Sequence, residues 1–305
     1  MDSTQEMVFQ IVKPIIQKCL TGYNGCIFAY GQTGSGKTFA MEGLQGNQRG
    51  VIPRVAEQLM LYIENNSRRD NLEGIDFSVR CSYLEIYQES LRDLLLEKKY
   101  QGDLKIRMDP NSITGKELYV EGLTETSIKT SSDLLRLIQN GTKNRTTGET
   151  NMNKVSSRSH AVFTLIIEQT ERKLVIADSI DNLPTVTKKR SKIHLIDLAG
   201  SERADSTGAT GIRLKEGSAI NVSLSCLGNV INALSTSNTY VPYRDSKLTY
   251  LLSDSLGGNS LTLVLACLTP LASVYEETIA TLRFAERAKK VKNKPTINVD
   301  PATLR

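Results

Sequence analysis

The sequence predicts an α/β fold, a layered sheet with helices on both faces, and three observations support this prediction. Short apolar runs typical of strands alternate along the chain with helical patterns. A glycine-rich turn directly follows the first of these runs. The length of 305 residues, 39% of them hydrophobic, suits one large domain or two modest ones with a sizeable core.

The expected strands are apolar runs at Cys26–Tyr30, Phe77–Ile86, Ala161–Gln169, Lys192–Leu198 and Leu261–Leu268. The expected helices lie between them, at Thr4–Leu20, Lys37–Met41, Val51–Asn65, Ser131–Asn140, Asn221–Ala233, Ser246–Ser255 and Glu276–Lys290. Arg172–Arg190 is polar and contains Pro184, which predicts a mobile loop between neighbouring strands. Val291–Arg305 holds two prolines and little periodicity, so we expect an extended linker after the last helix.

Charge and cysteine usage narrow the class of protein. The net charge of +5 and the pI near 8.8 favour an acidic partner without naming it. Five scattered cysteines without a C-x-x-C pair indicate structural thiols in a reducing cytoplasm rather than disulfides or a zinc site. No run approaches ~20 apolar residues and the N-terminus is polar, so we expect neither a membrane span nor a secretory signal. The two histidines, His160 and His194, are expected to be structural hydrogen-bonding residues.

A glycine-rich segment matches the phosphate-binding pattern G-x-x-x-x-G-K-[ST] in full, with the residues Gly31, Gln32, Thr33, Gly34, Ser35, Gly36, Lys37 and Thr38. Glycines let the backbone curl so that its N–H groups point at phosphate oxygens, and the following helix adds the positive end of its dipole. Lys37 is expected to reach the β- and γ-phosphates, and the Thr38 hydroxyl to bind Mg²⁺. The strand before the loop and the helix after it supply the context that this motif requires.

Two further segments are candidates for sensing the γ-phosphate. Asp197-Leu198-Ala199-Gly200 follows an expected strand, which places Asp197 to hold the Mg²⁺ shell through water and Gly200 to bring its N–H to the γ-phosphate. The run Ser156-Ser157-Arg158 offers hydroxyls for Mg²⁺ or water and a guanidinium for a carboxylate. Taken alone, the first segment also suits a turn at the end of a strand, and the second suits a polar loop.

The order of phosphate loop, serine-rich loop and D-x-x-G is the order expected of a nucleotide switch machine. Together these segments closely resemble the kinesins, with FAYGQTGSGKT at the phosphate loop, NKVSSRSH at the first switch and DLAGSE at the second. GVIPR, SYLEIYQESLRDLL, VPYRDSKLT and DSLGGNS also look like kinesin segments, so that the resemblance spans essentially the whole chain. It implies a P-loop NTPase of the kinesin motor fold with a central, mostly parallel mixed sheet. It also implies ATP and Mg²⁺ as cofactors, and ATP hydrolysis coupled to movement along microtubules.

The resemblance assigns roles to residues of the two switches. Arg158 and Glu202 match the arginine and glutamate of an ion pair that closes over the γ-phosphate in kinesins, and Glu202 is expected to relay a proton from the attacking water. Ser156 and Ser157 match the serines that hold Mg²⁺ and that water, and Gly200 matches the γ-phosphate sensor. The expected catalytic residues are therefore Glu202, Arg158, Ser157 and Gly200. The expected metal-binding residues are Thr38, Ser157 and, through water, Asp197.

Segments nearer the C-terminus resemble the tubulin-binding surface of kinesins. Leu214–Leu234 matches the loop and helix that lie along tubulin and move with the second switch, and Val241–Ser260 matches the adjacent microtubule-facing loop and helix. Arg244 and Lys247 are expected to bind the acidic tubulin surface, so that binding should weaken with salt. Tyr250 stands where kinesins more often have arginine, which removes one charge from this surface.

The resemblance divides the chain into a motor domain at 1–290 and a neck linker at 291–305. A linker after the motor core is typical of plus-end-directed kinesins, and the ending KNKPTINVDP looks most like the chromokinesin group. We therefore expect a place in the cytoplasm on the microtubule cytoskeleton, with the spindle as the candidate structure. No coiled coil follows in the sequence, so a dimer is expected only through segments outside this chain.

The start of the chain departs from the family pattern. Kinesin motor domains usually carry some tens of residues before the position that matches Thr4, including a central strand with an Arg-x-Arg-Pro motif that packs the adenine. No such motif occurs in this sequence, and the loss of an interior strand is expected to expose two inner sheet edges. Either the sequence is incomplete at its start, which we favour, or the protein is a degenerate motor.

Other classes of protein fit less well. A signalling GTPase needs an [NT]-K-x-D guanine motif, which is absent from the sequence, and a myosin motor is far longer. Nucleic-acid binding is not expected of this domain, because the basic residues are not clustered with aromatic ones. A non-catalytic microtubule-binding protein descended from a motor remains the alternative to an active ATPase.

Overall fold

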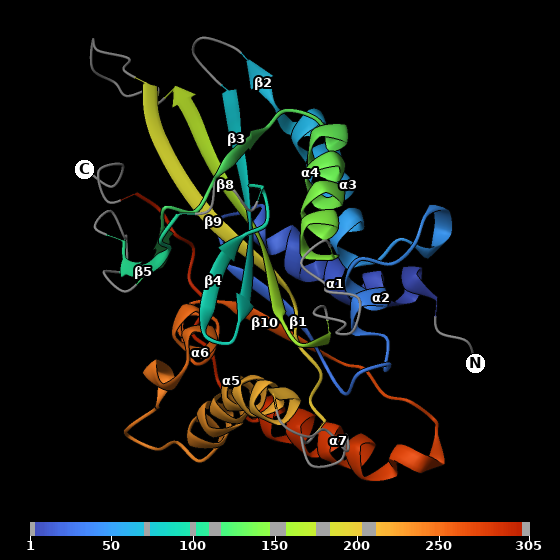
Figure 1. The fold of residues 1–305 in the computed structure, drawn as a ribbon. Helices are drawn as coiled ribbons and strands as arrows, with labels where there is room; N and C mark the ends of the chain where they lie inside the picture. Colours follow the sequence, from blue (N-terminus) through green and yellow to red (C-terminus); the bar gives the residue numbers. More distant parts are fainter. Residues whose placement is uncertain are drawn as a thin grey trace.

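The computed structural model describes residues 4–69, 74–97, 102–109, 117–146, 157–174, 184–202 and 212–300. At residues 68, 69, 174, 184 and 212–221 only the backbone is described. One central sheet separates two layers of helices (Figure 1). The described part of the chain therefore has the layered α/β architecture that the alternating pattern predicts.

The central sheet has the strand order β10-β1-β9-β8-β3-β2. The bounds of these strands are Leu261–Ala266 (β10), Gly25–Tyr30 (β1), Pro184–Asp197 (β9), His160–Leu174 (β8), Gly74–Tyr87 (β3) and Arg68–Arg69 (β2). β1 pairs in parallel with β10 and β9, whereas β8 pairs antiparallel with β9 and β3, and β2 antiparallel with β3. Consequently β10, β1, β9 and β3 run in one direction, and β8 and β2 in the other. The expected mixed, mostly parallel sheet is confirmed.

Helices cover both faces of the sheet, as expected. One layer consists of α1 (Gln5–Cys19), α3 (Val51–Asn66) and α4 (Ser131–Thr146). The other layer consists of α5 (Ile212–Ser235), α6 (Lys247–Leu251) and α7 (Tyr275–Lys289). Figure 1 shows the second layer below the sheet, on the side away from α3 and α4.

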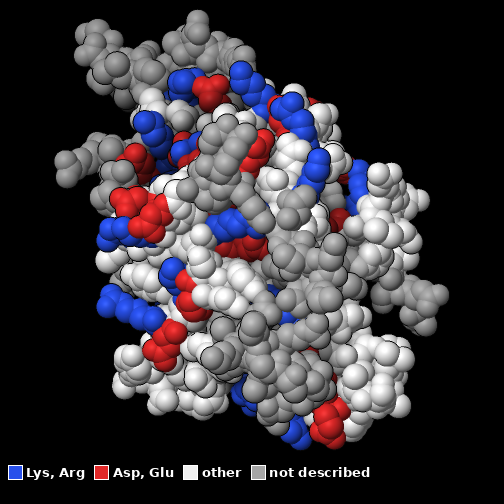
Figure 2. Space-filling view, viewed as in Figure 1, with Lys and Arg blue, Asp and Glu red and all other residues white. Residues whose placement is uncertain are grey.

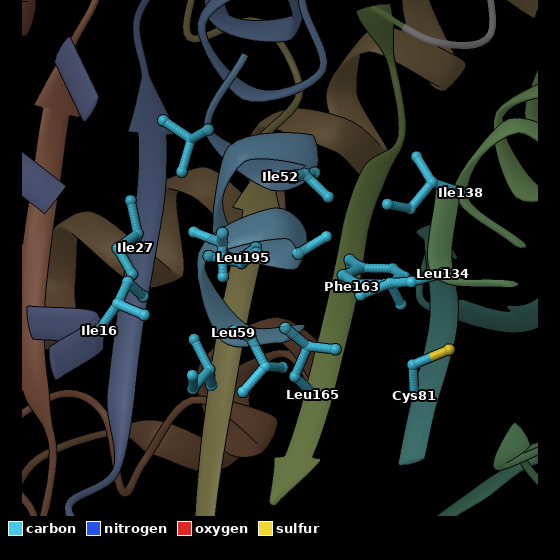
Figure 3. Packing of buried hydrophobic residues seen from close by; sticks show 14 of the residues in the cluster. Ile16, Ile27, Ile52, Leu59, Cys81, Leu134, Ile138, Phe163, Leu165 and Leu195 are labelled. Atoms are coloured by element: carbon cyan, nitrogen blue, oxygen red, sulfur yellow. The ribbon is translucent and has the colours of Figure 1, made fainter. Parts of the chain in front are cut away.

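Two hydrophobic cores, one on each face, follow from the alternation of side chains along the strands. On β1, Ile27 and Ala29 belong to the core under the first layer, whereas Cys26 and Phe28 belong to the core under the second. Figure 3 shows the first core, in which Leu59 of α3 lies among strand side chains. β1 is therefore buried on both faces, which holds the loop that follows it in a fixed position.

Smaller elements complete the fold. β4 (Ser90–Asp93) and β7 (Thr126–Ile128) pair antiparallel with β3, and β5 (Lys105–Met108) with β6 (Leu118–Glu121) forms a separate two-stranded sheet. The short helix α2 (Lys37–Met41) follows β1. The described residues also include the 3₁₀ turns η1 (Gly46–Gln48), η5 (Tyr243–Asp245) and η6 (Ala272–Val274).

The segment predicted as a mobile loop, Arg172–Arg190, is strand at both of its ends. β8 and β9 extend into it in antiparallel register, while its middle lies outside the described residues. The prediction was wrong at these ends because polarity was taken as a sign of irregular structure. Ion pairs accommodate the charges on the strands, such as Lys189 with Glu171 (3.5 Å) and Arg172 with Asp76 (2.7 Å).

Several helix ends also differ from the predicted ones. α5 begins at residue 212 rather than 221, α4 ends at residue 146 rather than 140, and α6 ends at residue 251 rather than 255. The added turns of α4 are polar, and those of α5 are interrupted by charged residues and a glycine, so hydrophobic periodicity gave no sign of them. The extension of α4 bears directly on the site, because it carries Arg145 into the protein interior.

β10 lies at the end of the described sheet, next to β1. The expectation of two exposed inner edges was wrong for the described residues, because the sheet runs from β10 to β2 without a gap. Five of the six β10 residues, 261–265, are half-buried. The open edge on this side is therefore that of β10 itself.

The segment after α7, residues 291–300, contains no helix, as expected of a linker, and is bound along the molecule. The side-chain amide of Asn293 donates to the carbonyl of Ser260 (2.7 Å). Farther on, the carbonyl of Asn298 accepts from the N–H of Arg190 on β9 (3.0 Å). The segment therefore follows the edge of the core toward β9, while the division into motor domain and neck linker stays a prediction.

Candidate functional site

The phosphate-loop segment Gly31–Gly36 joins the end of β1 to the start of α2. Gly36 caps α2 in the left-handed conformation (φ 93°), which residues with a Cβ rarely adopt. A Cβ at Gly31 would lie 2.3 Å from the carbonyl oxygen of Cys267, which follows β10. Both glycines are therefore needed for the loop to curl between β1 and the end of β10.

Lys37, the first residue of α2, is 7% exposed. Its ammonium group donates to the carbonyl of Gln32 in the same loop (2.9 Å). Burial lowers the pKa of Lys37, and the carboxylates of Asp197 and Glu202 partly oppose this effect. A buried cation at the start of a helix favours an anionic ligand, as expected of a phosphate site.

A cavity of about 280 Å³ opens beside the loop. Its lining comes from three segments that are far apart in the sequence, and consists of Thr33, Gly34, Gly36, Lys37, Thr38, Phe39, Ser157 and Leu198. The structure thus brings the phosphate loop together with the predicted first switch, at Ser157, and the predicted second switch, at Leu198.

Asp197 ends β9 and is 2% exposed. Its Oδ2 accepts hydrogen bonds from the Thr38 hydroxyl (2.7 Å) and the Arg145 guanidinium (2.8 Å), whereas its buried Oδ1 has no hydrogen-bond partner among the described residues. Mg²⁺ prefers oxygen ligands and keeps several waters, which suits a threonine hydroxyl beside a carboxylate oxygen that is still open. The predicted metal-binding residues Thr38 and Asp197 are therefore adjacent, and Ser157 lines the same cavity.

Arg145, near the end of α4, was not predicted as a site residue. Its side chain is 2% exposed and pairs with Asp197, while Ser159 accepts from the guanidinium through its carbonyl (2.9 Å) and its hydroxyl (3.3 Å). Burial opposes the charge on Arg145, but Asp197 and the neighbouring groups Tyr83 and Glu42 together favour it more strongly, so the pKa of the guanidinium is raised. The side chain therefore connects the second switch, at Asp197, to the first switch, at Ser159.

A signal for Arg145 was present in the sequence. The buried positions of α4 are Leu134, Ile138, Gly141 and Arg145, spaced four, three and four residues apart. A charged residue on the buried stripe of a helix needs a partner in the interior. Because the predicted helix stopped at residue 140, this position was not recognised as part of the stripe.

Glu202 in the second switch is bound to the phosphate loop. Its carboxylate accepts from the N–H of Thr33 (2.8 Å) and from the Thr33 hydroxyl (2.5 Å). The N–H of Gly200 donates to the carbonyl of Ser157 (2.9 Å), and a Cβ at Gly200 would lie 2.3 Å from both the Glu202 carboxylate and the Thr33 hydroxyl. The second switch therefore contacts both the phosphate loop and the first switch through direct hydrogen bonds.

The catalytic roles predicted for Ser157, Arg158, Gly200 and Glu202 remain predictions, although the structure places Ser157, Gly200 and Glu202 around the phosphate loop. The ion pair between Arg158 and Glu202 is likewise a prediction. Ser156 lies outside the described residues.

His160, the first residue of β8, is 2% exposed and is hydrogen-bonded through both ring nitrogens. Nδ1 accepts from the N–H of Ala199 (3.1 Å), and Nε2 lies 2.7 Å from the hydroxyl of Ser223 on α5. Burial lowers the pKa of His160 to about 3, so the ring is neutral. His160 has the structural role that the sequence predicted.

The predicted tubulin-binding residues lie at η5 and α6. Arg244 is exposed, its guanidinium lies 5.6 Å from the ring centre of Tyr250, and no carboxylate is within ion-pair distance of it among the described residues. Lys247 begins α6, and its N–H donates to Glu89 in the turn after β3 (2.6 Å). The departure at Tyr250 therefore places an aromatic ring against the arginine expected to contact tubulin.

Residues 1–291 match the family model described as the kinesin motor domain. The chain belongs to the kinesin motor-domain family. Curated kinesins agree along nearly the whole chain. Kinesin-like protein Klp68D of Drosophila melanogaster is 48% identical over 302 residues, which are 98% of this chain and 36% of that protein. Chromosome-associated kinesin KIF4A of Homo sapiens is 46% identical over 308 residues, which are 98% of this chain and 23% of that protein.

Solved kinesin structures share the fold. The structure of a fast kinesin has a TM-score of 0.84 and 40% identity, and the match covers 98% of this chain and 80% of that one. The KIF14 dimer with AMP-PNP, in complex with a microtubule, has a TM-score of 0.84 and 39% identity, covering 97% of this chain and 80% of that one. The kinesin motor fold is thereby confirmed, and membership of the kinesin family implies that the chain binds ATP.

On the face shown in Figure 2, Lys and Arg side chains lie interspersed with Asp and Glu side chains. No helix in the described ranges combines the length and apolar character that a membrane crossing requires.

Proposed function

We propose that this chain is the motor domain of a microtubule motor, in which microtubules stimulate ATP hydrolysis and hydrolysis drives movement. The observation that carries the proposal is the single cavity lined by the phosphate loop, by Ser157 and by Leu198. A change at a phosphate bound there reaches both switches at once. That arrangement suits a nucleotide-driven motor better than a protein that merely binds ATP.

In this proposal ATP is the substrate and Mg²⁺ the cofactor. The loop Gly31–Thr38 binds the phosphates through its N–H groups, and Lys37 balances their charge. The Thr38 and Ser157 hydroxyls and, through water, Asp197 would hold Mg²⁺, which neutralises charge that develops on the phosphate oxygens. The contact of Thr38 with Asp197 and the unpaired Oδ1 of Asp197 support this assignment.

The chemical step gives roles to the switch residues. Water attacks the γ-phosphorus and the bond to ADP breaks, while Glu202 takes a proton from that water through a second water. Arg158 pairs with Glu202 and closes the switches, and the Gly200 N–H senses the γ-phosphate. Because Glu202 is bonded to Thr33 and Gly200 to Ser157, closure requires both groups to exchange partners.

The finer assignments follow from kinesin membership and the positions of named residues. We assign tubulin as the partner, with Arg244 and Lys247 in the contact, plus-end direction from a linker that follows the core, and a place on cytoplasmic or spindle microtubules. The chain spans about a third or less of the curated relatives it matches. Gliding of polarity-marked microtubules over immobilised protein tests the direction.

ATP turnover of the purified chain, with and without microtubules, tests the central proposal. A motor shows turnover that microtubules raise at least tenfold. Microtubule binding without turnover would support the alternative, a catalytically crippled kinesin-like protein. Absence of both turnover and microtubule binding would contradict both proposals.

A further inference from the structure

His160 bridges two parts of the molecule that the proposed motor must coordinate. Its Nδ1 accepts from the backbone N–H of Ala199, so the proton of the neutral ring is on Nε2, which donates to the Ser223 hydroxyl. Ala199 lies in the second switch, between Asp197 and Gly200. Ser223 lies on α5, the helix expected to lie along tubulin. One rigid ring thus spans the distance between them.

The sheet holds this ring in place. His160 is in register with Ile86 of β3, and its neighbour Ala161 is in register with Asp197 of β9. Because strands flank β8 on both sides, the backbone of His160 is fixed, and its ring can follow a displacement of α5 only by turning about its side-chain bonds, which also displaces the acceptor of the Ala199 N–H. A shift of α5 must therefore either move the second switch or leave a buried polar group without a partner, which costs free energy.

We propose that His160 is a positioning residue that transmits the position of α5 to the second switch and so couples tubulin binding to nucleotide turnover. This inference rests on the proposed function, since it concerns the route between the two sites of the motor. His160 is absent from the lining of the phosphate cavity, so it acts through Ala199 and not on the nucleotide.

Apolar packing offers a competing route between the same elements. Leu198 and Ala199 belong to the same hydrophobic core as Leu227 of α5. The two routes, hydrogen bonding through His160 and apolar packing, can be separated by substitution. The substitution must remove the hydrogen bond between His160 and Ser223 and leave the hydrophobic core intact. The bridge has two such positions, one at each end of the bond between β8 and α5.

Two substitutions cut the bond from opposite sides. His160→Asn keeps an acceptor near the position of Nδ1 and removes the bond to Ser223. Ser223→Ala removes the same bond and leaves His160 unchanged. The matched control is Ser235→Ala, because the hydroxyl of Ser235 on the same helix donates to the carbonyl of Asn232 within that helix (2.9 Å).

Release of a fluorescent ADP analogue reports the coupling, with microtubule cosedimentation and melting temperature measured beside it. In His160→Asn and Ser223→Ala, acceleration of ADP release by microtubules should fall at least fivefold, while microtubule affinity stays within twofold. The double variant should be no worse than either single variant, because all three lack the same bond. Ser235→Ala should behave as the wild type does.

Wild-type acceleration in a folded Ser223→Ala variant would overturn the inference, and this variant alone decides if His160→Asn fails to fold. If the double variant loses much more of the acceleration of ADP release than either single variant does, the effect comes from packing. That result would also overturn the inference. A wild-type chain that binds microtubules without accelerated ADP release contradicts the proposed function, and the inference with it. The two failures are thereby distinguishable.

Discussion

Arg145 and Asp197 form an ion pair that is almost withdrawn from water, each side chain being 2% exposed. Burying two charges costs free energy, which close pairing and further hydrogen bonds must offset. Ser159 supplies such bonds to Arg145, and the Thr38 hydroxyl supplies one to Asp197. The carboxylate expected to organise the Mg²⁺ shell is thus oriented by a residue that does not line the phosphate cavity.

Arg145→Met should lower the free energy of unfolding by about 3–5 kcal/mol, because it leaves the Asp197 charge buried without its partner. Urea unfolding followed by circular dichroism measures the change. Arg136→Met is the matched control on the same helix, since Arg136 is 72% exposed and its pair with Asp133 spans 3.5 Å. The control should cost less than about 0.5 kcal/mol. Equal effects of the two substitutions would contradict the role given to the buried pair.

Glu202→Ala and Arg158→Ala should each reduce microtubule-stimulated ATP turnover about 100-fold or more, since each removes one member of the predicted closing pair. Nucleotide affinity should stay within about threefold, because Lys37 and the loop remain. Steady-state turnover and titration with a fluorescent nucleotide measure the two quantities. Glu286→Ala is the control, as Glu286 is 71% exposed on α7. Stimulated turnover at the wild-type level in both variants would remove the assignment.

The sequence predicted the site residues that short motifs carry and missed those that tertiary packing supplies. Lys37, Thr38 and Asp197 were found because their chemistry dictates a local spacing. Arg145 reaches Asp197 across 52 positions of the chain, and Thr33 reaches Glu202 across 169. Nothing in a local pattern specifies such contacts, although a charge on the buried stripe of a helix was a usable sign.

At the scale of elements, η5 and α6 present the charge expected to meet tubulin. Arg244 stacks over Tyr250, so its guanidinium is held by an aromatic ring instead of an acidic partner. Lys247 is joined to the turn after β3, where Glu89 accepts from its backbone N–H. The surface formed by η5 and α6 therefore carries two cations, Arg244 over an aromatic ring and Lys247 at the start of a helix.

Tyr250→Arg should tighten microtubule binding about two- to fivefold at low salt, because it adds a positive charge toward an acidic surface. The gain should shrink as the ionic strength rises toward 0.15 M. Cosedimentation at several salt concentrations measures both effects. Gln10→Arg adds the same charge on α1, in the opposite helix layer, and should leave the affinity within twofold. An equal gain from both substitutions would show that only net charge matters.

Strands and helices could be predicted where the apolar pattern was strong. The prediction failed where a strand or helix continued through residues without that pattern. The predicted strands at the centre of the sheet all exist, because burial on both faces demands continuous apolar runs. The ends of β8 and β9 were missed, since ion pairs such as Lys189 with Glu171 stabilise polar strands without any apolar alternation. The first turns of α5 were missed because charged residues and a glycine interrupt the apolar pattern there.

At the scale of the whole molecule, both of the chain's histidines are held neutral by the fold. Burial lowers the pKa of His160 to about 3 and that of His194 to about 4. His194 lies in β9 on the sheet, where its Nδ1 is 2.9 Å from the Thr164 hydroxyl. In the unfolded chain a histidine has a pKa of about 6.5. Below that pH the unfolded chain therefore binds protons at both histidines that the folded chain does not bind.

The free energy of unfolding should be independent of these histidines above pH 6.5 and should decrease as the pH falls from 6.5 toward 4. At pH 5 the contribution of His160 alone is about 2 kcal/mol, and His194 acts in the same direction. Urea unfolding at pH 7.5, 6.5, 5.5 and 5.0 measures the decrease. In His160→Asn the free energy of unfolding should decrease less with pH, by about 2 kcal/mol less at pH 5, because that histidine no longer contributes. Stability that does not change between pH 7.5 and 5.0 would contradict both lowered pKa values.

The position of β10 has a consequence for local opening of the protein. Only this strand separates β1 from the open edge of the described sheet, and β1 leads directly into the phosphate loop. Hydrogen bonds at a strand edge exchange their protons with solvent at a lower free-energy cost than those at the centre of a sheet. The loop therefore lies one strand away from an open edge of the described sheet, with the carbonyl of Cys267 packed against Gly31. A segment or partner that pairs with or covers β10 would slow amide exchange in β10. It would also make β1 and the phosphate loop that follows it more rigid.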